Sequence, residues 1–157
     1  MLRCVPGPWI KHKEETSLEL SIIKDLISDL VRTNRMLLVI DSGGAVSEMY
    51  ADGLIEPQFA DEWVTIESKS WHIHLNASKV DGVQFVEAED NVHTMPKMYY
   101  VRFSGREHDT LLRFYFPNPW LDDDEQPAEF QPEKLQVFET FRDRYVGKGG
   151  VEFVKRD

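Results

Sequence analysis

The sequence of 157 residues has a single cysteine, Cys4, and no apolar run near the roughly 18 residues of a membrane-spanning helix. One thiol excludes an internal disulfide and any site built from several cysteines. Positive charge is also scarce, since 18 Lys and Arg face 28 Asp and Glu, for a net charge of −10. This balance argues against non-specific nucleic-acid binding and against adhesion to anionic membranes. Residues 11–14 are polar where a signal peptide is apolar, so we expect a cytoplasmic protein.

The common enzyme motifs are missing as well. The sequence has no glycine-rich phosphate loop, no nucleophile elbow and no helical His-Glu-x-x-His motif. Ser42-Gly43-Gly44 is typical of a hairpin turn instead. Carboxylates are plentiful, but no spacing singles out an acid and a base. We therefore predict no catalytic residue.

The pattern of apolar residues predicts one α+β domain over residues 16–157, after an irregular leader over residues 1–15. Apolar residues at helical spacing predict an N-terminal helix from Thr16 to about Asn34, and Pro132 begins a second, C-terminal helix that stops at Gly147. Between the helices we expect an antiparallel sheet of about seven strands, a meander at residues 36–41, 46–51, 63–68, 71–76, 83–87, 98–104 and 111–116. Residues 151–154 can add a short strand or a packed tail.

The run from Trp71 to Asn76 alternates apolar and polar residues with the period of a strand. His72 and His74 therefore share one face, with their Cα atoms roughly 6.6 Å apart. Histidine is the commonest metal ligand in proteins. Paired histidines on one sheet face make His74 and His72 the first candidates for holding a metal-bearing cofactor.

Two later strands carry a second polar pattern. Tyr100 and Arg102 share one face of their strand, and Arg113 and Tyr115 share one face of the next. Arginine matches a carboxylate with a two-pronged donor. Together with the histidines, these residues are predicted to share the sheet face away from the helices. Such a face suits a planar ligand that carries a metal and two carboxylates, such as haem. The alternative is an amphipathic sheet whose outer face is solvated and whose charges pair across strands.

Other candidate sites lie in loops. His93 and Met95, in a segment expected to be irregular, are possible axial ligands of a haem iron, although a loop histidine is more often only exposed to solvent. Asp122, Asp123, Asp124 and Glu125 form an acidic run without the spacing of a calcium loop. We expect this run to be a solvated loop that can attract a basic protein partner.

The run Trp71-His72-Ile73-His74-Leu75-Asn76, followed by Val80 and Val83-Gln84-Phe85, resembles a segment of the HutX/ChuX-like haem-utilisation carriers, whose fold is half of the HemS-type proteins. The strands at 99–103 and 111–116, and the closing helix with Phe138, Phe141, Arg142 and Tyr145, are also similar to that family. The resemblance covers residues 20 to 146, is best to a cyanobacterial branch, and does not extend to the leader or the acidic run.

The resemblance implies a HemS/ChuX-like fold, a homodimer and binding of haem or a related tetrapyrrole for intracellular transfer or storage. It assigns His74 as the metal ligand and His72 as a weaker match. In this hypothesis Arg102 and Arg113 contact the propionates, and Tyr100 and Tyr115 complete the cofactor-binding face. Two alternatives stay open. One is a haem-degrading enzyme with an external reductant, and the other is a non-haem interaction or assembly module on the same fold.

Overall fold

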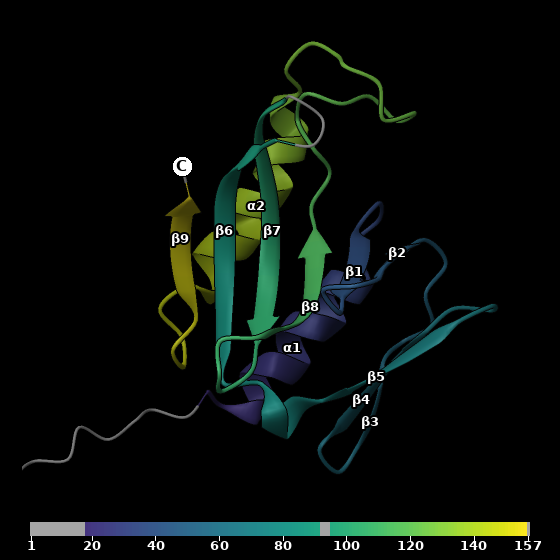
Figure 1. Cartoon of the computed structure of the whole chain (residues 1–157), viewed down its shortest axis with the longest axis vertical. Coiled ribbons are helices and arrows are strands. Elements are labelled where there is room, and N and C mark those ends of the chain that lie inside the picture. The colour runs from purple at the N-terminus through teal and green to yellow at the C-terminus, as the bar shows by residue number, and fades with distance from the viewer. Residues whose placement is uncertain (1–17, 92–94, 157) are drawn as a thin grey trace, which may run out of the picture.

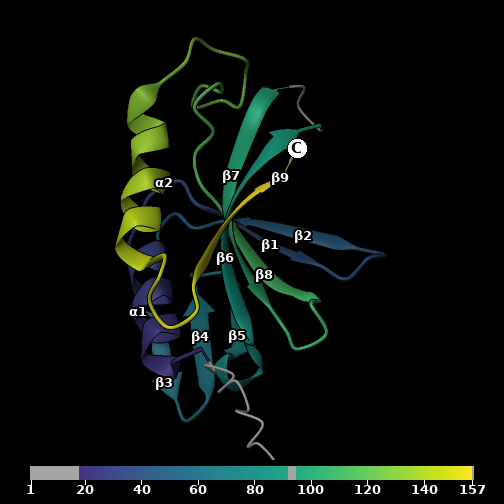
Figure 2. The same ribbon diagram turned by 90° about the vertical axis from the view of Figure 1, so that its left-hand side faces the viewer.

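The computed structural model describes residues 18–91 and 95–156, which form two helices and two β-sheets. Helix α1 spans Leu20–Val31 and helix α2 spans Pro132–Tyr145. Both helices lie on the same side of the larger sheet, whose other side carries no helix of the described chain (Figure 2). In the described chain, the larger sheet therefore has one face covered by helices and one face without a helix, which we call the open face.

The larger sheet has six strands in an order that does not follow the sequence. From one edge to the other they are β2 (Val46–Tyr50), β1 (Leu37–Asp41), β8 (Thr110–Tyr115), β7 (Met95–Ser104), β6 (Gly82–Asp90) and β9 (Glu152–Arg156). Neighbours are antiparallel except β6 and β9, which are parallel. Strand β1 pairs with β8, far away in the sequence, and so brings the first hairpin beside the last (Figure 1).

The smaller sheet has three antiparallel strands, β3 (Gln58–Ala60), β4 (Trp63–Glu67) and β5 (His72–Asn76). A single turn of 3₁₀ helix, η1 (Ala77–Lys79), follows β5. The Asn76 side chain accepts a hydrogen bond of 3.0 Å from the Ser78 N–H at the start of this turn. An asparagine in this position favours the turn over a longer strand, so β5 ends where η1 begins.

One hydrophobic core joins both helices to both sheets. Helix α1 contributes its apolar stripe, Ile23, Leu26, Ile27, Leu30 and Val31, all buried. Phe138 of α2 packs against Tyr99 and Phe116, with ring centroids 5.0 and 5.3 Å away. Because side chains alternate along a strand, the neighbours of these core residues on β7 and β8 point to the open face.

The α+β class and both predicted helices are confirmed, with two differences in detail. The described part of α1 begins at Leu20, and Thr16 and the predicted leader lie outside the described residues. The described chain has nine strands in two sheets, whereas we expected about seven in one antiparallel sheet. Strand β3 was missed because it is short and exposed, and the parallel pairing of β9 depends on contacts far away in the sequence.

Candidate functional site

The predicted histidines lie on the outer face of the three-stranded sheet. Val64, Ile66 and Leu75 of this sheet are buried in the core, so the alternating side chains of β4 and β5 point away from it. His72 and His74 are exposed on that outer side. The register places Thr65 directly opposite His74, and Trp63 lies two residues before Thr65. We call Trp63, Thr65, His72 and His74 the histidine face.

The geometry of the histidine face favours one metal-ligating nitrogen. Thr65 Oγ1 and His74 Nδ1 share a hydrogen bond of 3.0 Å. When Nδ1 carries the proton and donates it to Thr65, the lone pair of Nε2 is free to bind a metal. Ligating histidines are commonly oriented by a hydrogen bond of this kind at the other ring nitrogen. The rings of His72 and His74 lie 5.0 Å apart between centroids, at an angle of 53°.

The predicted arginines and tyrosines lie together on the open face of the six-stranded sheet. Tyr100 is directly opposite Tyr115, and Arg102 is directly opposite Arg113. The two tyrosine rings are 4.9 Å apart between centroids. Burial raises the pKa of Tyr115, so its phenol is neutral at neutral pH. The strand alternation in the sequence therefore agrees with the structure for these four side chains, and their part in ligand binding stays a prediction.

Arg102 is held by hydrogen bonds to its neighbours. Its Nε donates to Thr110 Oγ1 at 2.7 Å, Nη1 donates to Gln84 Oε1 at 3.1 Å, and Nη2 donates to the His108 carbonyl oxygen. Burial lowers the pKa of Arg102, and Arg156 and Arg113 lower it further. These bonds join β6, β7 and the turn that leads to β8, so the Arg102 guanidinium ties the sheet together.

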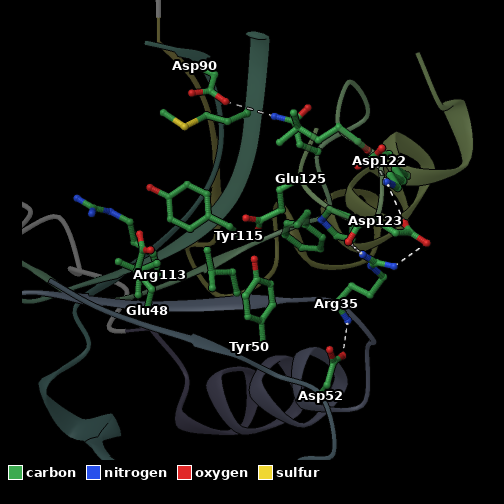
Figure 3. Close-up of a pocket in the computed structure, with 18 of the residues that line it drawn as sticks. Arg35, Glu48, Tyr50, Asp52, Asp90, Arg113, Tyr115, Asp122, Asp123 and Glu125 are labelled. Atoms are coloured by element: carbon green, nitrogen blue, oxygen red, sulfur yellow. Dashed lines mark hydrogen bonds and ion pairs between the residues drawn. The ribbon is translucent and has the colours of Figure 1, made fainter. Parts of the chain in front are cut away.

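Arg113 and Tyr115 border a cavity of about 640 Å³ on the open face (Figure 3). The cavity lies between the strands β2, β1 and β8 and the segment that follows β8. This segment includes the predicted acidic run, residues 122–125, which is exposed. Arg113 Nη1 lies 3.7 Å from Asp41 Oδ2, and Arg113 Nε is buried without a hydrogen-bond partner in the described chain.

The prediction that the histidines share one sheet face with these arginines and tyrosines is wrong, because the predicted site residues form two groups on two sheets. His72 and His74 belong to the three-stranded sheet, whereas Tyr100, Arg102, Arg113 and Tyr115 belong to the six-stranded sheet. Neither histidine is among the residues that border the cavity. Of the further axial-ligand candidates, Met95 begins β7 instead of lying in a loop, and His93 lies outside the described residues.

Sequence reasoning missed several residues of these two surfaces. Thr65 and Trp63 join the histidine face only through the pairing of β4 with β5. Tyr50 and Glu48 reach the cavity only because β2 pairs with β1 and β1 pairs with β8. The alternation within each strand was visible in the sequence, but the pairing of distant strands was not.

The described residues hold no cluster of three or more His, Cys, Asp or Glu side chains placed to bind a metal ion. A metal at the histidine face therefore needs further ligands from outside the described residues, and the nitrogens of a porphyrin are one such source. No helix in the described part of the chain is long and apolar enough to cross a membrane.

A protein-family model matches residues 24–146, which is most of the chain. The chain belongs to this family. No protein with a curated description matches the sequence. The solved structures that resemble this one identify the fold as ChuX-like.

Three of these structures illustrate the likeness. The heme-binding protein ChuX has a TM-score of 0.62 at 12% identity, covering 82% of this chain and 76% of ChuX. A protein from Agrobacterium tumefaciens has a TM-score of 0.59 at 16% identity, covering 85% of this chain and 73% of that protein. Holo-PhuS, a heme-binding protein from Pseudomonas aeruginosa, has a TM-score of 0.60 at 9% identity, covering 80% of this chain and 34% of PhuS. At these low identities, the similarity to ChuX and the other two proteins shows a shared fold and nothing more.

Proposed function

We propose that this ChuX-like protein binds haem or a related tetrapyrrole for intracellular transfer or storage, with His74 as the iron ligand. The observation that carries the proposal is the exposed His74 imidazole, whose Nδ1 is hydrogen-bonded to Thr65 and whose Nε2 faces away from that bond. The names of ChuX and PhuS as heme-binding proteins support the choice of ligand. The resemblance further implies a cytoplasmic homodimer.

The histidine face fits haem better than the cavity does. An imidazole can ligate the iron directly, and Trp63, 48% exposed, offers an aromatic surface to the porphyrin. The cavity, in contrast, is bordered by eight carboxylates and three cationic side chains. Haem carries two propionates, and like charges at close range repel. We therefore place the iron on His74.

His72 takes a supporting role in this proposal. The two axial ligands of haem approach the iron from opposite faces of the ring. His72 and His74 point from the same side of one strand, with ring centroids 5.0 Å apart. His72 therefore lies beside the ligating imidazole, where it orients the bound group instead of ligating its other face.

The test is a visible-absorption titration of the purified protein with hemin. We expect a saturable Soret shift, and His74→Ala should weaken binding at least tenfold because it removes the iron ligand. His108→Asn is the matched control, since His108 is exposed in a turn with a φ of 61° that asparagine tolerates. Unchanged hemin affinity in His74→Ala would overturn the proposal.

The arginines and tyrosines of the six-stranded sheet are tested in the same titration. Arg113→Gln removes the predicted propionate partner and should leave hemin affinity unchanged, because Arg113 borders the cavity and not the histidine face; a several-fold loss would show that a propionate reaches Arg113. Arg102→Gln also breaks the bonds that hold Arg102 in place, so its folding must be checked by circular dichroism. Full affinity in Arg113→Gln would confine the haem to the histidine face.

A second candidate function is that of an interaction module on the same fold. The acidic loop Asp122, Asp123, Asp124 and Glu125 is exposed and held in place, since Arg35 Nη1 lies 2.8 Å from Asp123 Oδ2. A fixed, exposed acidic loop suits a basic protein partner. A partner retained by the full chain and lost in Asp124→Asn with Glu125→Gln, with no tetrapyrrole in the purified protein, would favour this function.

A further inference from the structure

Two rows of side chains line the floor of the cavity and follow directly from the strand register. Tyr50, Leu37 and Tyr115 face one another across β2, β1 and β8. Glu48, Val39 and Arg113 form the next row. Since neighbouring strands lie about 4.8 Å apart, each row spans about 10 Å from end to end.

The floor offers apolar and aromatic surface to a ligand. Leu37 and Val39 supply its centre, and the strand register puts Tyr50 and Tyr115 on either side of Leu37. Tyr50 is 49% exposed, so its ring is available for contact. A volume of about 640 Å³ lies within the range of about 300–1,000 Å³ that is typical of small-molecule sites.

The charge around this floor is strongly one-sided. Eight carboxylates and three cations border the cavity, a formal difference of five negative charges. Each of the cations has an ion-pair partner, although Arg113 Nε has no hydrogen-bond partner in the described chain. Arg35 and Lys134 both pair with Asp123, at 2.8 and 3.4 Å, and Arg113 pairs with Asp41 at 3.7 Å.

Several carboxylates of the cavity form no ion pair with a cation of the described chain. Glu48 and Glu125 border the cavity and form no ion pair within the described residues. Figure 3 shows Glu48 beside Arg113 and Glu125 on the far side of the Tyr115 ring, with the Tyr50 ring below Glu125. The negative charge therefore lies at separate places along the cavity.

This distribution decides between classes of ligand. A compact metal ion needs several ligating side chains at one point, and the described residues provide no such cluster. An anion is opposed by the surplus of carboxylates. An organic molecule with several ammonium groups joined by methylene segments fits this cavity. Its positive charges are spaced like the carboxylates, and its methylene segments suit the apolar floor.

We infer that this cavity binds an elongated organic polycation of the polyamine class. Its ammonium groups pair with Glu48 at one end and with Glu125 at the other, and its methylene segments lie on Leu37 and the rings of Tyr50 and Tyr115. Ammonium groups next to the tyrosine rings gain a further cation–π attraction. This site is separate from the histidine face and does not depend on haem binding.

Spermidine is the probe, measured by titration calorimetry with the full chain at about 0.15 M salt, where weak surface attraction is screened. We expect saturable binding of one spermidine per chain. Glu48→Gln and Glu125→Gln should each weaken it at least fivefold, and Tyr50→Ala should weaken it several-fold. Glu152→Gln is the matched control, because it removes the same charge from an exposed position on β9, outside the cavity.

Three results would overturn the inference. They are the absence of saturable binding, an equal loss of affinity in Glu152→Gln, and displacement of spermidine by Mg²⁺ at matched ionic strength. Either of the last two would show general charge attraction instead of a shaped site. Binding of a lysine-rich peptide without binding of spermidine would assign the carboxylates to a protein partner.

Discussion

At the scale of single residues, the bond between Tyr145 and Asp29 joins the two helices. Tyr145 Oη donates to Asp29 Oδ2 at 2.5 Å, and the side chain of Tyr145 is buried. We predict that Tyr145→Phe lowers the free energy of unfolding by about 1.5–3 kcal/mol, because a hydrogen bond to a charged group is lost. Urea denaturation measures this change. Tyr50→Phe is the control, and its effect should stay within about 0.5 kcal/mol, since Tyr50 is half exposed.

The same tyrosine gives a prediction for alkaline pH. Burial and the Asp29 carboxylate raise the pKa of Tyr145 above its ordinary value of about 10. The folded state holds the phenol proton of Tyr145 more tightly than the unfolded chain does. The resulting contribution to the free energy of unfolding is complete below pH 10 and is lost as pH rises from there towards the folded-state pKa. Unfolding free energies measured from pH 8 to 11 should therefore fall more steeply above pH 10 in the wild type than in Tyr145→Phe. An equal pH dependence of the unfolding free energy in the wild type and in Tyr145→Phe would show that the pKa of Tyr145 is not raised by folding.

Thr65 offers a test of how the proposed iron ligand is positioned. Thr65→Val keeps the shape of the side chain and removes the hydroxyl bonded to His74 Nδ1. We predict a loss of hemin affinity of about tenfold, which is the lower end of what the removal of such an orienting bond costs at metal sites. The Soret position should shift as well, because the imidazole loses its fixed orientation. Unaltered affinity and spectrum would mean that Thr65 has no part in the site.

At the scale of elements, the docking of α2 on the six-stranded sheet depends on Phe138. Its ring is 1% exposed and lies within 6.4 Å, between centroids, of the rings of Phe85, Tyr99, Phe116 and Phe153. We predict that Phe138→Ala lowers the free energy of unfolding by about 3–5 kcal/mol through the cavity it leaves. Gln136→Ala, exposed on the same helix, should change it by less than about 0.5 kcal/mol. Chemical denaturation of both variants measures these two changes in the free energy of unfolding.

The elements also show what the sequence can and cannot predict. Alternation within β5, β7 and β8 is a local property, and it placed His72 with His74 and Tyr100 with Arg102 correctly. The partners of each strand depend on the whole core. The sequence therefore did not reveal that the histidines lie on a separate sheet.

The cavity depends on long-range pairing in the same way. Its floor exists because β1, near the start of the chain, pairs with β8. Half of the carboxylates at its border belong to the segment after β8, which borders the same cavity. The acidic run was visible in the sequence as a charged loop, but its proximity to Tyr50 and Glu48 needs the fold. Candidate residues can be predicted from one strand at a time, whereas a cavity needs several strands together.

At the scale of the whole molecule, the ChuX-like fold carries two proposed binding surfaces that share no residue. The histidine face lies on the three-stranded sheet, and the carboxylate-lined cavity lies on the six-stranded sheet. Two sites are coupled only when a ligand at one changes the affinity of the other, and that coupling is reciprocal. A spermidine bound in the cavity neutralises charge on one sheet without contact with the other.

We therefore predict that the two ligands bind independently. Hemin affinity measured with saturating spermidine should agree with that of the free protein within about twofold at 0.15 M salt, where charges more than about 8 Å apart are largely screened. His74→Ala should leave spermidine binding intact, and Glu48→Gln should leave hemin binding intact. If spermidine and hemin instead exclude each other, the haem extends into the cavity. Arg113 would then be its propionate partner after all, because the buried Nε of Arg113 is the donor there that has no acceptor among the described residues.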